Sequence, residues 1–155
     1  LFLDEISSMS LDIQAKLLRA IEAQSFRRVG GTSLIKVDVQ IIAASNRDLP
    51  KMIRENQFRE DLFYRLNLVD LSLAPLRERK EDIPELVGFF LRTTNAKKGM
   101  NVTEVTPLAI QAMQRYDWPG NIRELANAIE RAMIFSDGKC IDLPDLPRDV
   151  SMQVS

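Results

Sequence analysis

Histidine is absent from the 155 residues, and cysteine occurs once, as Cys140. The lack of histidine excludes histidine general bases, Ser-His nucleophile pairs and zinc sites that need an imidazole ligand. A single cysteine cannot form an internal disulfide, which is typical of a reducing compartment and predicts a cytoplasmic protein. No apolar run reaches the ~18–20 residues that a membrane-spanning helix needs, so we expect no membrane partner.

Neither sign of charge dominates the chain. The sequence has 21 basic and 22 acidic side chains and a formal net charge of −1. Bulk electrostatics therefore indicate neither a nucleic-acid partner nor a membrane surface. A hydrophobic content of 45% and a charged content of 28% are typical of a globular protein, in one mid-sized domain or two small ones.

The first six residues combine an apolar run with two carboxylates, Asp4 and Glu5. A run that is apolar on both faces suits a strand inside a parallel sheet that helices cover. Strands of such a sheet need neighbours, and no residues precede this one. We therefore expect the chain to be a fragment of a larger protein.

Strand and helix patterns alternate in the first half. Ser10 is the predicted N-cap of a helix that runs to about Gln24 with one apolar stripe. The other predicted elements are a strand over 26–32 that enters a glycine turn, its hairpin partner over 34–36, a strand over 37–46, a short helix near Pro50, a helix over 58–66 and a strand over 68–73. This alternation predicts a parallel α/β sheet.

The second half has helical periodicity. A helix with Pro84 in its first turn is predicted to end at Gly99, and Thr106 is the predicted N-cap of a second helix. The turn at 118–121 separates it from a third helix, which is predicted to end before Gly138. The proline-rich segment 142–147 predicts a linker. We expect an α/β region over 1–74, a small helical domain over 75–147 and a linker or tail over 148–155.

Asp4 and Glu5 follow the first predicted strand, at the edge of a parallel sheet where ligands bind. In P-loop NTPases an Asp at this place holds Mg²⁺, usually through water, and a following carboxylate orients or deprotonates the attacking water. The alternative is that these acids only begin a solvated loop, because acidic side chains are mostly exposed.

Several blocks then occur in an order that resembles one family. These are LFLDEI at 1–6, LLR at 17–19 with FRRVGG at 26–31, VDV at 37–39 with IIAASNRDL at 41–49, FREDLFYRLN at 58–67, LRERKEDIP at 76–84 and WPGNIREL at 118–125. They resemble, in turn, the Walker B strand, the segment after it, the sensor I strand, the arginine-finger helix, the start of the lid and the sensor II helix of sigma-54-dependent transcription activators, also called bacterial enhancer-binding proteins. The resemblance covers residues 1–147. It implies an α/β fold, with a partial parallel-sheet AAA+ core followed by a small all-helical lid domain.

The resemblance also implies roles for polar residues at the ends of the predicted strands. Asp4 would hold Mg²⁺ through water, and Glu5 would act on the attacking water. Asn46 would reach the γ-phosphate or that water, and Ser45, where the family more often has Thr, would help to bind the nucleotide. The alternative for Ser45 and Asn46 is an ordinary cap between a strand and a loop.

Three arginines complete the implied site. Arg59 and Arg65 are both candidates for a finger inserted into a neighbouring subunit's nucleotide site, where a guanidinium can hold phosphate oxygens bidentately. The alternative is a surface arginine paired with Glu60 or Asp61. The sequence does not distinguish the two candidates. Arg123 would report the nucleotide state from the lid, or would pair with a nearby acid.

A phosphate-binding G-x-x-x-x-G-K-[S/T] segment is not found in these 155 residues, and Gly30-Gly31 fits a hairpin turn better. We therefore predict that the 155 residues alone do not hydrolyse ATP. The family uses ATP and Mg²⁺ in a ring, usually a hexamer, and couples hydrolysis to open-complex formation by sigma-54 RNA polymerase. Its sigma-contacting loop would lie upstream and its DNA-binding domain downstream, and a receiver domain of a two-component system is an open question.

Three other interpretations remain. The first is a non-catalytic oligomerisation or regulatory module on the same AAA+ scaffold. The second is a DNA-binding module formed by the helices of 106–135, which the neutral charge disfavours because phosphate contacts need clustered basic residues. The third is another AAA+ branch, which the blocks at 58–67 and 118–125 disfavour.

Overall fold

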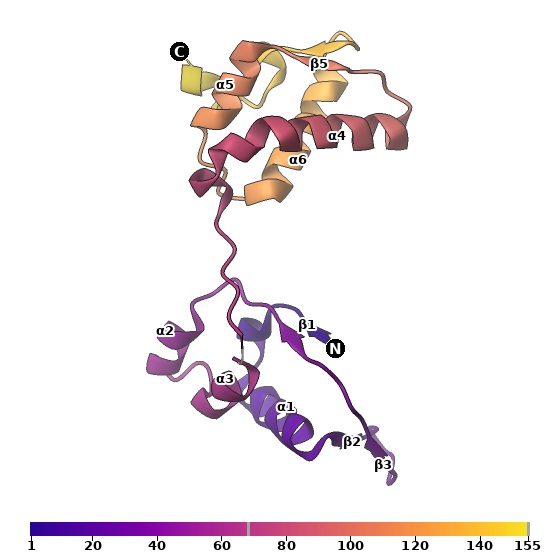
Figure 1. The fold of residues 1–155 in the computed structure, drawn as a ribbon, viewed down its shortest axis with the longest axis vertical. Coiled ribbons are helices and arrows are strands. Elements are labelled where there is room, and N and C mark those ends of the chain that lie inside the picture. The colour runs from indigo at the N-terminus through magenta and orange to yellow at the C-terminus, as the bar shows by residue number, and fades with distance from the viewer. Residues whose placement is uncertain (68, 155) are drawn as a thin grey trace. The chain divides into compact units, whose positions relative to one another are not determined.

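The computed structural model describes residues 1–67 and 69–154, and the chain forms two compact units, Leu1–Leu71 and Ser72–Ser155 (Figure 1). The first unit mixes helices with short strands, and the second is mainly helical. Each unit has its own apolar core. In the described residues no helix is both long and apolar enough to cross a membrane.

Two pairs of strands and three helices make up the first unit. Its elements are β1 (Phe2–Leu3), the 3-10 turn η1 (Ile6–Ser8), α1 (Leu11–Ala23), β2 (Ser25–Arg27), β3 (Leu34–Lys36), β4 (Ile42–Ala43), α2 (Leu49–Arg54) and α3 (Glu60–Leu66). The strands β1 and β4 are parallel, with Phe2 opposite Ile42. The strands β2 and β3 form the predicted antiparallel hairpin.

Side-chain caps fix where the first helices begin. The Ser10 hydroxyl accepts a hydrogen bond from the Ile13 N–H at 3.5 Å, which confirms the predicted start of α1. The Asp48 carboxylate accepts one from the Lys51 N–H at 2.9 Å, so α2 begins next to Pro50. The buried core beneath these helices is small and consists of Ile6, Met52, Phe58 and Leu62.

The predicted strand over 68–73 is wrong for the described residues 69–73, which form neither strand nor helix. Leu68 lies outside the described residues. An extended segment becomes a strand only when a neighbour accepts and donates its backbone hydrogen bonds. Among the described residues, β1 and β4 pair only with each other. The Val69 and Leu71 side chains are accordingly 75% and 83% exposed. For the same reason the strands predicted over 1–6 and 37–46 are each only two residues long.

Helices α4, α5 and α6 form the second unit with several short elements. These are η2 (Leu76–Glu78), η3 (Lys80–Asp82), α4 (Ile83–Lys98), β5 (Glu104–Val105), α5 (Pro107–Arg115), α6 (Asn121–Phe135), β6 (Cys140–Ile141), η4 (Leu143–Asp145), α7 (Arg148–Ser151) and η5 (Met152–Val154). Its largest fully buried side chains are Leu76, Ile83, Met113, Trp118, Leu125, Ile129, Met133 and Ile141.

Local signals define the helix ends of this unit as predicted. Gly99 ends α4 in the left-handed region, with φ of 67°. The Thr106 hydroxyl accepts a hydrogen bond from the Ala109 N–H and caps α5. Trp118 is 1% exposed and its indole N–H donates to the Met113 carbonyl at 2.7 Å, so it packs in the core with its polar group satisfied.

The second unit is mainly helical as predicted, and β5 and β6 add one short parallel pair. One prediction about this unit was wrong. Residues 142–154 are not a linker and tail, because η4 and α7 fold onto the unit and bury Leu146 and Val150. The Asp142 carboxylate caps η4, and proline near the start of a helical turn loses no hydrogen bond. Proline content alone therefore predicted this segment incorrectly.

Candidate active site

The carboxyl ends of β1 and β4 lie at one edge of their parallel pair. The Ala44 N–H donates to the Leu3 carbonyl at 2.8 Å, and the Ile6 N–H donates to the Ala44 carbonyl at 3.0 Å. These bonds continue the pairing past both strands, so the loop with Asp4 and Glu5 lies beside the loop that leads to Asn46. The structure thus brings together the polar groups that the sequence placed at the ends of two strands.

Glu5 has an unusual backbone conformation, with φ of 51° in the left-handed region. Its N–H donates to the Asp4 carboxylate at 2.9 Å, and its carbonyl accepts hydrogen bonds from the N–H and the hydroxyl of Ser8 at 2.9 and 2.7 Å. Both acidic side chains are exposed. Local hydrogen bonds therefore hold the backbone of the acidic pair, while the Glu5 carboxylate forms none within the described residues.

A buried serine orients Asn46. Ser7 is 5% exposed, and its hydroxyl donates to the Asn46 side-chain carbonyl oxygen at 3.2 Å. With that oxygen held, the amide NH₂ of Asn46 is the group available to contact a ligand. Ser7 was not predicted from the sequence as a site residue.

The Ser45 hydroxyl is engaged in its own loop. It donates to the Arg47 carbonyl at 2.8 Å and accepts from the Arg47 N–H at 3.1 Å. This is the local cap that we kept as the alternative for Ser45. A contact from Ser45 to a nucleotide remains a prediction.

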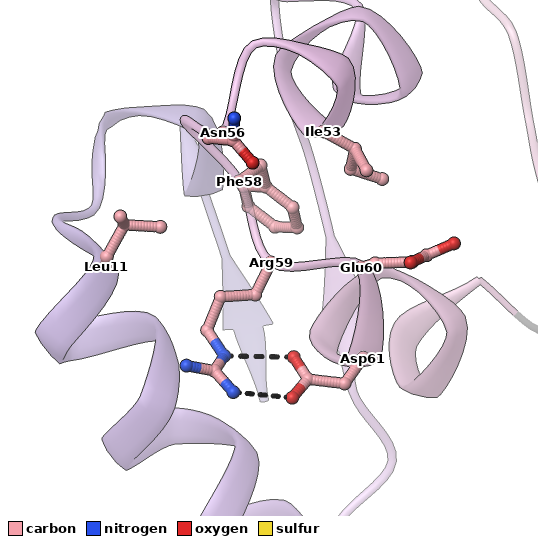
Figure 2. Close-up of a pocket in the computed structure, with 7 residues that line it drawn as sticks. All are labelled: Leu11, Ile53, Asn56, Phe58, Arg59, Glu60 and Asp61. Carbon is pink, nitrogen blue, oxygen red and sulfur yellow. Dashed lines mark hydrogen bonds and ion pairs between the residues drawn. The ribbon is translucent and has the colours of Figure 1, made fainter.

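Arg59 precedes α3 and forms a bidentate ion pair with Asp61 (Figure 2). Its Nε and Nη2 donate to the two carboxylate oxygens at 3.0 and 2.6 Å. The hydrogen bond with Asp61 raises the pKa of Arg59, and the same bond lowers the pKa of Asp61. Arg65 is exposed in the last turn of α3, and no ion pair involves it within the described residues.

An open hollow of about 480 Å³ lies next to this ion pair (Figure 2). Its lining residues are Leu11, Ile53, Asn56, Phe58, Arg59, Glu60 and Asp61. Asp4, Glu5 and Asn46 do not line this hollow, so it is separate from the carboxyl edge and lies beside Arg59.

Gln14 is a second residue near the site that was not predicted from the sequence. It is fully buried in α1, and its side chain forms hydrogen bonds with three backbone groups outside that helix. A signal for it was present, because Gln14 is three and four residues before Leu17 and Leu18 and so shares the apolar face of α1. A polar side chain on a buried stripe needs internal partners.

Arg123 is exposed on α6 in the second unit, so its nucleotide contact remains a prediction. No group of three or more cysteine, aspartate or glutamate side chains in the described part of the chain could hold a metal ion. The Mg²⁺ prediction for Asp4 does not require such a group, because Mg²⁺ keeps several waters and takes one or two carboxylates together with phosphate oxygens.

Comparison with known families excludes two of the other interpretations, a separate DNA-binding module and another AAA+ branch. Residues 1–72 match the family described as the sigma-54 interaction domain, and residues 77–155 match the AAA+ ATPase lid domain. The chain belongs to the sigma-54-dependent activators. It therefore has the predicted fold class, a partial AAA+ core followed by a helical lid, rather than that of a separate DNA-binding module.

Individual proteins of the activator family support this assignment. The chain is 48% identical over 154 residues to the regulatory protein AtoC of Escherichia coli K12, a match that covers 99% of the chain and 33% of AtoC. The crystal structure of NtrX from Brucella abortus in complex with ADP is similar at 40% identity, with a TM-score of 0.90, over 96% of the chain and 35% of NtrX. The NtrX complex with ATP gives a TM-score of 0.89 at the same identity and coverage. The chain spans about a third of the length of these relatives.

Proposed function

We propose that these residues provide the catalytic acids, the sensors and the arginine finger of an ATPase that works in a ring. The juxtaposition of Asp4, Glu5 and Asn46 at the carboxyl edge of β1 and β4 is the observation that supports this proposal. The full-length protein would couple ATP hydrolysis to open-complex formation by sigma-54 RNA polymerase. The family match and the NtrX complexes with ADP and ATP are consistent with this function.

The acidic pair fits the metal and water side of such a site. Asp4 would hold Mg²⁺ through water, and Glu5 would accept a proton from the attacking water. Bound Mg²⁺ neutralises charge on the phosphate oxygens. Both carboxylates are exposed at the edge, so a nucleotide can reach them without a change in the core.

Asn46 and two further residues would contact the nucleotide. With its carbonyl oxygen held by Ser7, the Asn46 NH₂ group would donate to the γ-phosphate or to the attacking water. Ser45 would lie beside it, and Arg123 would contact the γ-phosphate from the lid. These three residues would let the protein respond to the nucleotide state.

Arg59 and Arg65 are the two candidates for the finger that acts on a neighbouring subunit. Arg59 would have to exchange its Asp61 carboxylate for phosphate oxygens, which a guanidinium binds with the same geometry. Arg65 is exposed and would need no such exchange. Both remain candidates, in a ring that is usually a hexamer.

The phosphate cradle would come from outside these residues, since no G-x-x-x-x-G-K-[S/T] segment is found among them. The full-length protein would act in the cytoplasm, contact sigma-54 RNA polymerase through an upstream loop and bind DNA through a downstream domain.

Phosphate release tests the acidic pair. In the full-length native protein, Glu5→Gln is expected to lower kcat by about 10²–10⁴-fold, the range of general acid–base catalysis, because the water loses its base. Glu22→Gln, at an exposed position of α1, is the matched control and should leave kcat unchanged. A full-length protein without turnover would favour the non-catalytic module. Turnover by the 155 residues alone, above that of a Glu5→Ala variant, would contradict the prediction that they need a separate cradle.

Single substitutions can also identify the finger. Removing it, by Arg59→Ala or Arg65→Ala, should lower kcat by about 10³–10⁵-fold, and the other variant should have a smaller effect. Mixing the inactive variant with Glu5→Gln protein should restore turnover, because the first supplies an intact acidic pair and the second an intact finger. If neither mixture recovers, the finger does not act between subunits.

A further inference from the structure

Gln14 is the larger of two buried polar side chains among the described residues, and the other is Ser7. It is 0% exposed and lies on α1, between the acidic edge and the start of α3. Burying an amide costs free energy unless its N–H and C=O groups form hydrogen bonds, so the buried Gln14 side chain depends on its partners.

The Gln14 amide joins three separate backbone segments. Its Nε2 donates to the Met9 carbonyl at 2.8 Å and to the Gln57 carbonyl at 3.2 Å. Its Oε1 accepts from the Arg59 N–H at 2.8 Å. Both ends of one planar group are used, so a shift of any one segment strains the other two bonds.

Two of these segments lead back to the carboxyl edge. Met9 directly follows η1, the turn that Glu5 begins and in which Ser7 binds Asn46. Gln57 is connected through its side chain, because the Arg47 guanidinium donates to its Oε1 at 3.0 Å and Arg47 follows Asn46. Gln14 is thus tied to the acidic loop through one carbonyl and to the sensor loop through another.

The third segment is the start of α3. Arg59 is the N-cap residue of this helix, and its N–H is held by Gln14 rather than by a neighbouring turn. The helix has Arg59 at one end and Arg65 in its last turn. The position of both candidate fingers therefore depends on where Gln14 holds the start of α3.

We propose that Gln14 is a positioning residue, which sets α3 relative to the acidic edge and so couples the nucleotide site of one subunit to the arginine that it offers its neighbour. This inference rests on the proposed function. Gln14 touches neither nucleotide nor finger side chain in this scheme. Its effect passes through the Met9, Gln57 and Arg59 backbone.

The test uses Gln14→Met in the full-length native protein, because methionine has a similar length and is unbranched but cannot form these bonds. We expect kcat to fall by about 10²-fold, the effect of a misplaced catalytic group, while KM for ATP changes by less than about threefold. Gln111→Met, at an exposed position of α5, is the matched control and should behave like the native protein. A thermal melt and the backbone amide exchange of Arg59 accompany the kinetics. We expect a folded variant with faster exchange at Arg59.

Subunit mixing separates positioning of the finger from damage to the subunit's own site. Gln14→Met protein keeps its acidic pair, and Glu5→Gln protein keeps a well-placed α3, so a mixture of the two should turn over faster than the mean of the separate proteins. A mixture that stays at the mean, or a Gln14→Met variant with native kcat, overturns the inference. The mixture of Glu5→Gln with the finger variant is the reference. If that reference fails to recover, the proposed function fails, and if only the Gln14→Met mixture fails, the inference alone is wrong.

Discussion

The two units of the chain are stabilised in different ways. The first buries four apolar side chains and joins its loops through hydrogen bonds of Gln14 and Ser7. The second packs α4, α5 and α6 around a much larger apolar core, which includes the buried Trp118. Six of the seven predicted site positions, all except Arg123, lie in the unit with the smaller core. The predicted site and most of the apolar packing thus lie in different units, and the first unit should unfold more easily.

Leu62→Ala should have the largest effect, because Leu62 is fully buried in the small core of the first unit. A loss of about 2–5 kcal/mol is expected for such a truncation, enough to unfold that unit. Trp118, the sole tryptophan, lies in the second unit, so the urea midpoint of its fluorescence should stay at the native value. The unfolding transition of the first unit should disappear from the far-UV circular dichroism signal. Leu108→Ala, at an exposed position, is the control. A joint shift of both signals would show that the units unfold together.

Asn121→Ala tests the turn before α6. The Asn121 side chain accepts a hydrogen bond from the buried Leu76 N–H at 2.9 Å, and its φ is 53°. We expect a loss of about 1–3 kcal/mol for the unsatisfied N–H, seen as a lower midpoint in the Trp118 fluorescence. Asn127→Ala, exposed on the same helix, should change it little. Equal midpoints for the two variants would contradict this role.

A matched pair of cap variants compares the units directly. Thr106→Ala removes the cap of α5 and Ser10→Ala that of α1, each with an expected loss of about 0.5–2 kcal/mol. Thr106→Ala should lower only the midpoint of the fluorescence transition, which reports the second unit. Ser10→Ala should lower only the midpoint of the first unit's transition in far-UV circular dichroism. A cap variant that moves both transitions would argue against separate stability.

The smallest effect is a pH dependence of the second unit. The hydrogen bond from the Thr106 hydroxyl holds the pKa of Asp142 below its ordinary value of 3.8. Because the folded pKa is the lower one, this stabilisation is present above the unfolded pKa and is lost as the pH falls through the folded pKa. Asp142→Asn keeps an acceptor oxygen but does not titrate. The acid-induced fall of its fluorescence midpoint, measured from about pH 5 to about pH 3, should be shallower than in the native chain.

Elements defined by local chemistry were predictable from the sequence. The helices α1 and α5 begin at the Ser10 and Thr106 caps, and α4 has a proline in its first turn and Gly99 at its end. These signals act within one turn of the helix. The strand over 68–73 was not predictable, because its state depends on a partner strand and not on its own alternation. The fold of 142–154 depends on burial of Leu146 and Val150, which proline content does not reveal.

The same distinction between local and long-range determinants applies to the residues of the candidate site. Asp4, Glu5 and Asn46 were predictable, because residues that follow parallel strands meet at one edge. For Gln14 only burial was predictable, from its place on the apolar face of α1. Its three partners were not predictable, since they are backbone groups from segments up to 45 residues away. The Arg59 pairing with Asp61 was foreseen only as one of two alternatives.

The left-handed backbone of Glu5 has a consequence for how variants at this position behave. A side-chain-bearing residue at φ of 51° is strained by roughly 1–2 kcal/mol, and glycine is not. Glycine at position 5 would therefore relieve this strain and remove the carboxylate in one step. Under the proposed function, such a variant would be more stable than the native protein and inactive. Selection of variants for stability alone would then favour loss of the carboxylate that the proposed function requires.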